Sequence, residues 1–288
     1  MNVAVTGASG FIGKYVVSHF GKKYNVIALA RKKEKTNCYN YFMTDYSKSS
    51  LQALLKDCNA LIHLAASRPI SGNDDFFNNV RIDMNLFATA YEMGIENIIF
   101  VSSRSVYGSS PAPWKETTPP KPKNLYALAK LQSEAAAKFY NDKGMKIKIL
   151  RIAQVFGIGE YAQSAIATFI NHASEGKPLI VSVKGVQREY IYIKDLVDAF
   201  EKALLASDRK GIFNVGSGEI VDIPDMASSI AKAFDRTDLV KISEEIKYLT
   251  EYSLMDSSLF YKTFQWYPRY TFDMASLDVA NNYGKSLQ

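Results

Sequence analysis

The sequence is poor in the residue types that characterise several large classes of protein. It contains 2 cysteines, Cys38 and Cys58, and 3 histidines, His19, His63 and His172, in 288 residues. Two cysteines are too few for a disulfide framework, and histidines this far apart do not form a metal-ligand motif. We therefore expect a protein of the reducing cytoplasm that binds no metal and whose cysteines are structural.

The chain also lacks a long apolar segment. No stretch of about 18 uninterrupted apolar residues occurs, so no membrane span is expected. The first residues lead directly into a strand and a glycine turn, without the basic region and cleavage site of a signal peptide. An apolar fraction of 47% and a charged fraction of 22% fit a soluble globular protein, and the length allows one large domain or a domain and a half.

Positive charge is only moderately in excess over negative charge. The net charge is +6 at pH 7 and the pI is about 9.0, but the basic residues are scattered and their clusters are short. A nucleic-acid partner is therefore not expected. The excess charge fits either a solvated basic surface or a field that attracts an anionic small molecule such as a nucleotide.

Glycine, in contrast, is concentrated in a motif close to the first residue. Residues 3–5 read as a buried strand, Gly7, Gly10 and Gly13 as a turn, and residues 11–20 as a helix. Such a strand–turn–helix unit brings backbone N–H groups and a helix N-terminus to a phosphate. The spacing is G-x-x-G-x-x-G rather than the more common G-x-G-x-x-G, and a turn that merely requires glycines is the alternative.

The rest of the first half alternates between strand and helix patterns, which predicts a parallel sheet with crossover helices. Strands are expected at 24–30, 39–44, 60–66, 97–102 and 146–152, and helices at 50–56, 75–93 and 125–142. Small residues end the 60–66 strand and leave room for a ligand, while His63 within it is expected to be packed rather than catalytic. A proline-rich segment, 109–123, is expected to be a loop over the site.

Beyond residue 156 the pattern changes. Helices are expected at 160–175, 194–206 and 224–234, and strands at 189–193 and 212–215, with 189–206 returning to the main sheet. We predict an α/β fold: a Rossmann-like, doubly wound parallel sheet with a smaller C-terminal α/β domain. Residues 1–156, with about 187–207, would form the dinucleotide-binding domain, and 157–186 with 208–288 the substrate-binding domain.

The residue after the second strand bears on cofactor choice. A carboxylate at this position binds the ribose hydroxyls of NAD, whereas an arginine accommodates the extra phosphate of NADP. The chain has Arg31 there, followed by Lys32 and Lys33, with Glu34 coming late. This favours NADP, although a basic loop on a basic protein would look the same.

Tyr126 and Lys130 are candidates for catalysis because residues four apart share one face of a helix. A lysine ammonium beside a tyrosine would stabilise the phenolate, which could then accept a hydroxyl proton. Ser102, Ser103 and Ser105 follow the preceding strand, and their hydroxyls could hold the same substrate oxygen. A second Y-x-x-x-K match at Tyr190 falls on a predicted strand, where four residues span about 13 Å, too far for this interaction.

Together these motifs resemble those of the extended short-chain dehydrogenase/reductase superfamily, in particular its NAD-dependent epimerase/dehydratase branch. The resemblance runs through most of the chain, in the segments TGASGFIG (6–13), LIHLAA (61–66), NNV (78–80), VSSRSVYG (101–108), YALAK (126–130), REYIYIKD (188–195), FNVGSGE (213–219) and FQWYPRY (264–270).

The resemblance implies roles for individual residues. A catalytic Ser–Tyr–Lys set would consist of Ser103, Tyr126 and Lys130, and Arg188 would contact the substrate diphosphate. A homodimer through the helices 75–93 and 125–142 is also implied. The residues that would bind the cofactor are Gly7, Gly10, Phe11, Ile12 and Gly13 at its diphosphate, Asp45 and Tyr46 on the adenine side, and Leu64, Ala65, Ala66 and Lys130 along its length. Arg31 joins this set because of its position after the second strand.

One departure from the resemblance concerns the reaction. The sugar-nucleotide 4,6-dehydratases follow the catalytic hydroxyl with an Asp-Glu pair that serves elimination, whereas this chain has Arg104 and Ser105. Dehydration is therefore disfavoured. We expect an NAD(P)-dependent epimerase or ketoreductase acting on a nucleotide-linked sugar. The alternatives left open are a non-catalytic dinucleotide-binding regulator and an NADPH-dependent reductase of a non-sugar ketone.

Overall fold

The computed structural model describes residues 1–32, 40–67 and 76–285. Its main element is a seven-stranded sheet in which every neighbouring pair of strands is parallel. The strands are short, largely buried and mostly apolar, as expected of a sheet covered on both faces. In sheet order they are β3 (Asn40–Met43), β2 (Asn25–Ala30), β1 (Asn2–Thr6), β4 (Ala60–His63), β5 (Asn97–Ser103), β6 (Lys146–Ile152) and β9 (Gly211–Val215).

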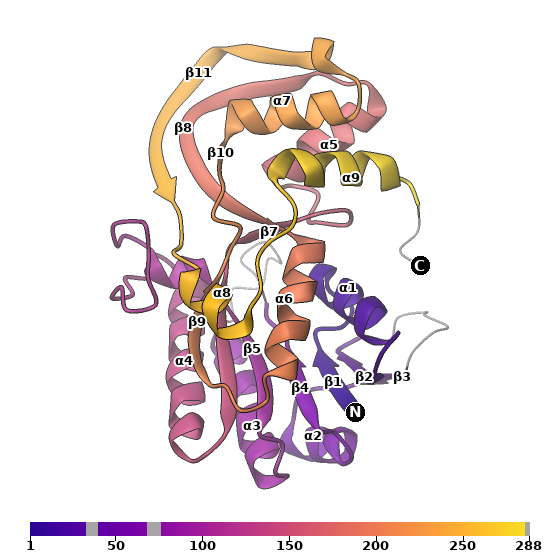
Figure 1. Cartoon of the computed structure of the whole chain (residues 1–288), viewed down its shortest axis with the longest axis vertical. Helices are drawn as coiled ribbons and strands as arrows, with labels where there is room; N and C mark the ends of the chain where they lie inside the picture. The colour runs from indigo at the N-terminus through magenta and orange to yellow at the C-terminus, as the bar shows by residue number, and fades with distance from the viewer. Residues whose placement is uncertain (33–39, 68–75, 286–288) are drawn as a thin grey trace.

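Helices cover both faces of this sheet (Figure 1). On one face α1 (Phe11–Phe20) and α6 (Ile193–Leu205) pack into one apolar core. On the other, α2 (Lys48–Leu55), α3 (Phe77–Glu92) and α4 (Leu125–Asp142) pack into a second. This confirms the predicted Rossmann-like, doubly wound fold.

The strand order reverses beside β1, which has β2 on one side and β4 on the other. In open parallel sheets a crevice for ligands lies at the carboxyl ends of the strands at such a switch point. The glycine turn, residues 7–10, follows β1 and residues 64–66 follow β4, so both lie at this crevice.

A smaller sheet forms the upper part of the molecule in Figure 1. Its long strands β8 (Leu179–Tyr192) and β11 (Val240–Ser253) are parallel, β10 (Ile220–Asp222) runs antiparallel to β8, and β7 (Gln154–Phe156) also pairs with β8. The helices α5 (Ala165–Glu175), α7 (Ile223–Ala233) and α9 (Phe272–Asn282) pack in this part, whereas α8 (Ser258–Phe264) packs against β9.

Two expectations about chain path are corrected by the structure. The strand expected at 189–193 to return to the main sheet is the end of β8 in the smaller sheet, and only the following helix, α6, packs on the main sheet. Conversely, β9 leaves the C-terminal part and pairs with β6 in the main sheet. The division into residues 1–156 with 187–207, and 157–186 with 208–288, stays a prediction.

Most predicted elements have slightly different ends. The 60–66 strand ends at His63, and the 160–175 helix begins at Ala165, because the Ser164 side chain caps it by accepting a hydrogen bond from the Ala167 N–H. Parts of the expected 39–44 strand and 75–93 helix, together with Lys33, Glu34 and Cys38, lie outside the described residues. Within the described part of the chain no helix is long and apolar enough to cross a membrane.

Candidate active site

The glycine turn after β1 is closely packed. Gly7 has φ +68°, which favours glycine, and a Cβ atom there would lie 2.8 Å from the Ala65 nitrogen. A Cβ atom on Gly13 would lie 2.2 Å from the Gly7 carbonyl oxygen. Helix α1 begins immediately after Gly10, and no side chain caps its N-terminus. This tight turn, followed by an uncapped helix N-terminus, fits a bound diphosphate.

A buried polar chain runs beneath the turn. Thr6 Oγ1 accepts hydrogen bonds from the Leu64 and Ala65 N–H groups at 3.2 and 3.3 Å, so its own hydrogen is donated to His63 Nδ1 at 2.6 Å. His63 Nε2 then carries the ring hydrogen and donates it to Asp83 Oδ1, also at 2.6 Å. His63 is 1% exposed, so it is packed, as expected.

The hydrogen-bonded series Thr6–His63–Asp83 ends near Lys130, the predicted catalytic lysine. Burial alone would raise the pKa of the Asp83 carboxyl, but the charge of Lys130 and the hydrogen bond from His63 hold it below its usual range. The Lys130 ammonium is itself buried, donates to the Val101 carbonyl at 3.0 Å and lies 4.7 Å from the centre of the Phe100 ring. Asp83 therefore supplies a buried negative charge near Lys130.

Helix α4 holds both Tyr126 and Lys130 in its first turns. Its start is fixed by Asn124, whose side-chain oxygen accepts the Ala127 N–H at 2.8 Å. The Tyr126 ring is half-buried and packs edge-on against Phe76. One turn separates Tyr126 and Lys130, and both line the same cavity.

The serines after β5 have distinct partners. Ser102 donates its hydroxyl hydrogen to Glu134 at 2.6 Å, and Glu134 in turn forms a buried, bidentate ion pair with Arg151. Ser103 Oγ accepts hydrogen bonds from the N–H and the hydroxyl of Ser105. The hydroxyl hydrogen of Ser103 is thus available to a ligand, whereas that of Ser102 is not.

A cavity of about 1030 Å³ collects many of these groups. Of the residues predicted for the site, those that line it are Phe11, Ile12, Leu64, Ala66, Ser103, Tyr126 and Lys130. The proline-rich segment also contributes several lining residues, among them Ser110 and Trp114. The glycine-turn helix, the end of β4, the β5 loop and α4 therefore meet at one space, the size of which suits a small-molecule ligand.

Other predicted residues lie outside the cavity lining. Gly7, Gly10, Gly13 and Ala65 form its packed support. Asp45 is exposed and accepts a hydrogen bond from the Ser47 N–H, and Arg31 is exposed directly after β2. The ring of Tyr46 is buried below the turn, where its hydroxyl accepts the Gly7 N–H at 3.3 Å and burial raises its pKa to about 12.

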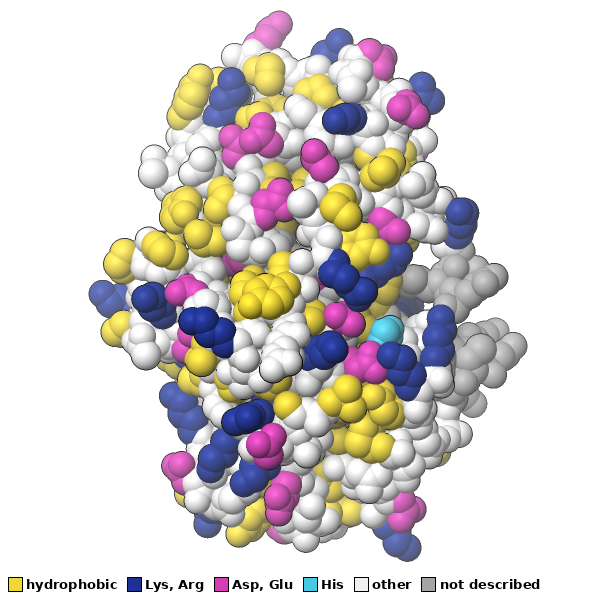
Figure 2. Space-filling model, viewed as in Figure 1, with side chains coloured by type: hydrophobic (Ala, Val, Ile, Leu, Met, Phe, Trp, Pro, Cys, Tyr) yellow, Lys and Arg dark blue, Asp and Glu magenta, His cyan; other side chains and the backbone are white. Residues whose placement is uncertain are grey.

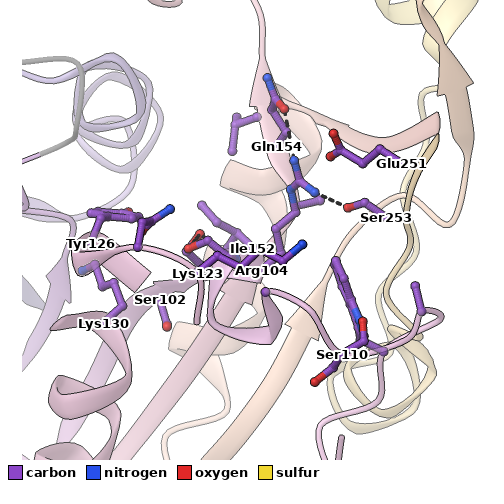
Figure 3. Close-up of a pocket in the computed structure, with 18 of the residues that line it drawn as sticks. Ser102, Arg104, Ser110, Lys123, Tyr126, Lys130, Ile152, Gln154, Glu251 and Ser253 are labelled. Atoms are coloured by element: carbon purple, nitrogen blue, oxygen red, sulfur yellow. Dashed lines mark hydrogen bonds between the residues drawn. The ribbon is translucent and has the colours of Figure 1, made fainter. Parts of the chain in front are cut away.

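Arg188 is also outside the lining. Its guanidinium forms a bidentate ion pair with Glu251 of β11, at 2.6 and 2.7 Å, and it is the Glu251 side chain that lines the cavity. Figure 3 shows Glu251, Ser253 and Gln154 on the side of the cavity opposite Tyr126 and Lys130. Residues 249–253 of β11 also line the cavity, and they were not among the predicted site residues. Most of β11 is exposed and no sequence motif marks it.

An open parallel sheet with a glycine turn at its switch point, beside a cavity lined by Ser103, Tyr126 and Lys130, is typical of dinucleotide-binding α/β proteins. Its sequence profile matches that of the NAD dependent epimerase/dehydratase family over residues 3–216. The chain belongs to this family, which confirms the resemblance seen in its motifs.

Individual relatives cover nearly the whole chain. A UDP-N-acetylglucosamine 4-epimerase from Bacillus cereus is 30% identical in sequence, and its structure superposes with a TM-score of 0.87 over 98% of both chains. A dTDP-4-dehydro-6-deoxyglucose reductase from Escherichia coli is 28% identical over 94% of both chains. A UDP-N-acetylglucosamine 4-epimerase from Methanobrevibacter ruminantium, solved with UDP-N-acetylmuramic acid, is 26% identical with a TM-score of 0.84 over 97% of both chains.

Proposed function

We propose that the protein is an NAD(P)-dependent epimerase or ketoreductase that acts on a nucleotide-linked sugar through Ser103, Tyr126 and Lys130. The observation that carries the proposal is that these three side chains line one cavity with Phe11 and Ile12, the first residues after the glycine turn. Family membership supports the class of reaction, and the relatives named above include both an epimerase and a reductase of nucleotide sugars.

In this proposal each side chain has one task. Tyr126 takes the proton from a sugar hydroxyl during oxidation and returns it during reduction. Ser103 donates its remaining hydrogen to the same oxygen. Lys130, held by the Val101 carbonyl, stabilises the Tyr126 phenolate by its charge. A bound nicotinamide would supply the hydride acceptor or donor for the carbon that carries this oxygen.

The choice of dinucleotide rests on the edge of the site beside β2. The glycine turn would hold the diphosphate of either cofactor. Arg31, exposed after β2, could pair with the extra phosphate of NADP, which favours NADP. The family description names NAD, and titration with both cofactors decides between them.

Epimerase and reductase differ in what happens to the cofactor. An epimerase restores it within each turnover and would retain it during gentle isolation, whereas a reductase consumes NADPH and would be isolated empty. A 4,6-dehydratase stays disfavoured because Arg104 stands where an acid would serve elimination. We also propose the cytoplasm as the compartment, because two cysteines fit a reducing environment.

The test is the substitution Tyr126→Phe. Activity is assayed with UDP-N-acetylglucosamine, with UDP-glucose, and with dTDP-4-dehydro-6-deoxyglucose plus NADPH. We expect turnover on the active substrate to fall by about 10²- to 10⁴-fold, the usual contribution of a positioned acid–base group, while cofactor binding persists. Tyr140→Phe, on the same helix, is the matched control and should keep wild-type turnover.

Three results would count against the proposal. Turnover by Tyr126→Phe within a few-fold of wild type would refute the mechanism. Wild-type protein that binds the cofactor but turns over no sugar nucleotide and no ketone would favour the non-catalytic regulator. Reduction of ketones that carry no nucleotide would favour the alternative reductase.

A further inference from the structure

The charged side chains that line the cavity are unequal in sign. Among the lining residues that the structure describes, three are cationic, Arg104, Lys123 and Lys130, and one is anionic, Glu251. Lys130 has its role beside Tyr126, and Glu251 is already bound to Arg188 through both carboxylate oxygens. The end of the cavity away from Tyr126 therefore has positive charge in excess.

Arg104 is the main source of this excess. It follows Ser103 directly and begins the short 3-10 helix η2 (Arg104–Tyr107). Its half-buried guanidinium donates to two neutral oxygens, Ser253 Oγ and Gln154 Oε1, the latter at 3.3 Å (Figure 3). Among the residues that the structure describes, no carboxylate lies within ion-pair distance of it.

Partial burial of the Arg104 guanidinium costs free energy unless an anion binds to it. Burial, and next the nearby charge of Arg188, lower the pKa of Arg104, yet an arginine stays charged in proteins. Two of its five N–H groups are used by Ser253 and Gln154, so others remain to bind anionic oxygens. Phosphate and carboxylate oxygens are the acceptors that guanidinium N–H groups bind most strongly.

Glu251 is paired with Arg188 and also interacts with Arg104 through its charge. Ser253, which accepts from Arg104, pairs in register with Arg188, and Glu251 lies two residues earlier on β11. The pKa of Glu251 is lowered first by its hydrogen bond to Arg188, and the charge of Arg104 acts in the same direction. Glu251 thus interacts with both guanidinium groups, and Glu189 also acts on Arg104 through its charge.

We infer that Arg104 is a substrate-binding residue that takes an anionic oxygen group of the substrate, and that Glu251 is the internal carboxylate with which this group competes. The inference rests on the proposed function, because the substrate must reach this end of the cavity. Two parts of a nucleotide sugar have the required chemistry: the diphosphate, and a carboxylate on the sugar ring. Either group would give Arg104 the anionic partner that it lacks among the described residues.

The experiment measures dissociation constants by calorimetry for UDP, UDP-glucose, UDP-glucuronate and dTDP-glucose, with NAD⁺ or NADP⁺ present. Arg104→Gln removes the charge, Arg104→Lys keeps it but loses the planar fork, and Glu251→Gln removes the competing carboxylate. Arg236→Gln, at an exposed position away from the cavity lining, removes the same charge and is the control. Thermal unfolding and cofactor binding verify that each variant is folded.

We expect Arg104→Gln to weaken binding about tenfold or more and Arg104→Lys to weaken it less. Glu251→Gln should tighten binding, by about threefold or more, and high salt should reduce this gain. Equal weakening for all four probes identifies the diphosphate as the anion. Weakening confined to UDP-glucuronate identifies a sugar carboxylate.

Two results would overturn the inference. Affinities of Arg104→Gln within about twofold of wild type for every probe would exclude Arg104 as a binding residue. Weaker binding by Glu251→Gln would exclude competition. If wild-type protein binds the dinucleotide but none of the sugar nucleotides, the proposed function itself fails, and that failure is seen before any variant is compared.

Discussion

Asp83 is a fully buried carboxylate whose partners explain why it is tolerated. His63 donates to it at 2.6 Å, and the Lys130 ammonium is close enough to lower its pKa. Through Thr6 the same chain reaches the N–H groups of Leu64 and Ala65. A single buried network thus connects the glycine turn with the lysine of the proposed catalytic set.

Asp83→Asn should therefore destabilise the protein. It leaves the buried Lys130 charge without its counter-charge, and we expect a loss of about 2 to 4 kcal/mol in the free energy of unfolding, measured in urea. Thr89→Val on the same helix is the control. The Thr89 hydroxyl is buried without a hydrogen-bond partner among the described residues, so its removal should change stability by less than about 1 kcal/mol. Equal losses in both variants would contradict this account.

Helices α3 and α4 pack against one another and also present apolar side chains to solvent. On α3 these side chains recur every seven residues, which places them on one face: Phe77, Met84 and Tyr91. On α4 they are Leu125, Leu128 and Phe139. Exposed apolar side chains grouped in this way are typical of a protein interface, which supports the predicted homodimer.

We expect light scattering to give twice the chain mass of 32.2 kDa. Met84→Lys should shift the protein towards the monomer, because a charge would be buried at the interface. Met274→Lys on α9 is the matched control, since Met84 and Met274 are both 52% exposed, and it should leave the dimer intact. A wild-type protein that is monomeric at all concentrations would refute the dimer.

The two sheets of the molecule are joined beside Glu189. This fully buried side chain of β8 accepts hydrogen bonds from the Gly218 N–H at 2.8 Å and the Met255 N–H at 3.0 Å. Gly216, just after β9 of the main sheet, has no room for a side chain, because a Cβ atom would lie 2.0 Å from Glu189 Oε1.

On the face shown in Figure 2, Lys and Arg side chains lie among Asp and Glu side chains over both parts of the molecule.

Glu189 makes the stability of the whole molecule depend on pH. Burial raises its pKa to about 7 from a usual value of 4.5. Between these values the folded protein holds a proton that the unfolded chain has lost, so this group makes the free energy of unfolding fall as pH rises through the window. The fall is at most about 3 kcal/mol.

Denaturant unfolding at several pH values tests this contribution. Glu189→Gln cannot titrate, so the difference between variant and wild type should change across pH 4.5 to 7 and stay constant above it. A difference that is independent of pH over the window would show that Glu189 does not titrate there.

Features that depend on local periodicity and short motifs can be predicted without the structure. The strand before Gly7, the helix after Gly10, and the helix that carries Tyr126 and Lys130 were all predictable, because each is set by neighbours within a few residues. The parallel sheet followed from the alternation of strand and helix, and the family from motifs in fixed order.

The contacts between distant segments, in contrast, become visible in the folded molecule. The tertiary structure assigned residues 189–192 to the smaller sheet and β9 to the main one, since a strand's partner depends on packing across the whole chain. It directed Ser102 to Glu134 and Arg188 to Glu251, and it brought β11 to the cavity beside Arg104. These contacts join residues 32 to 149 positions apart, and charges and hydrogen bonds at such separations leave no periodic signal in the sequence.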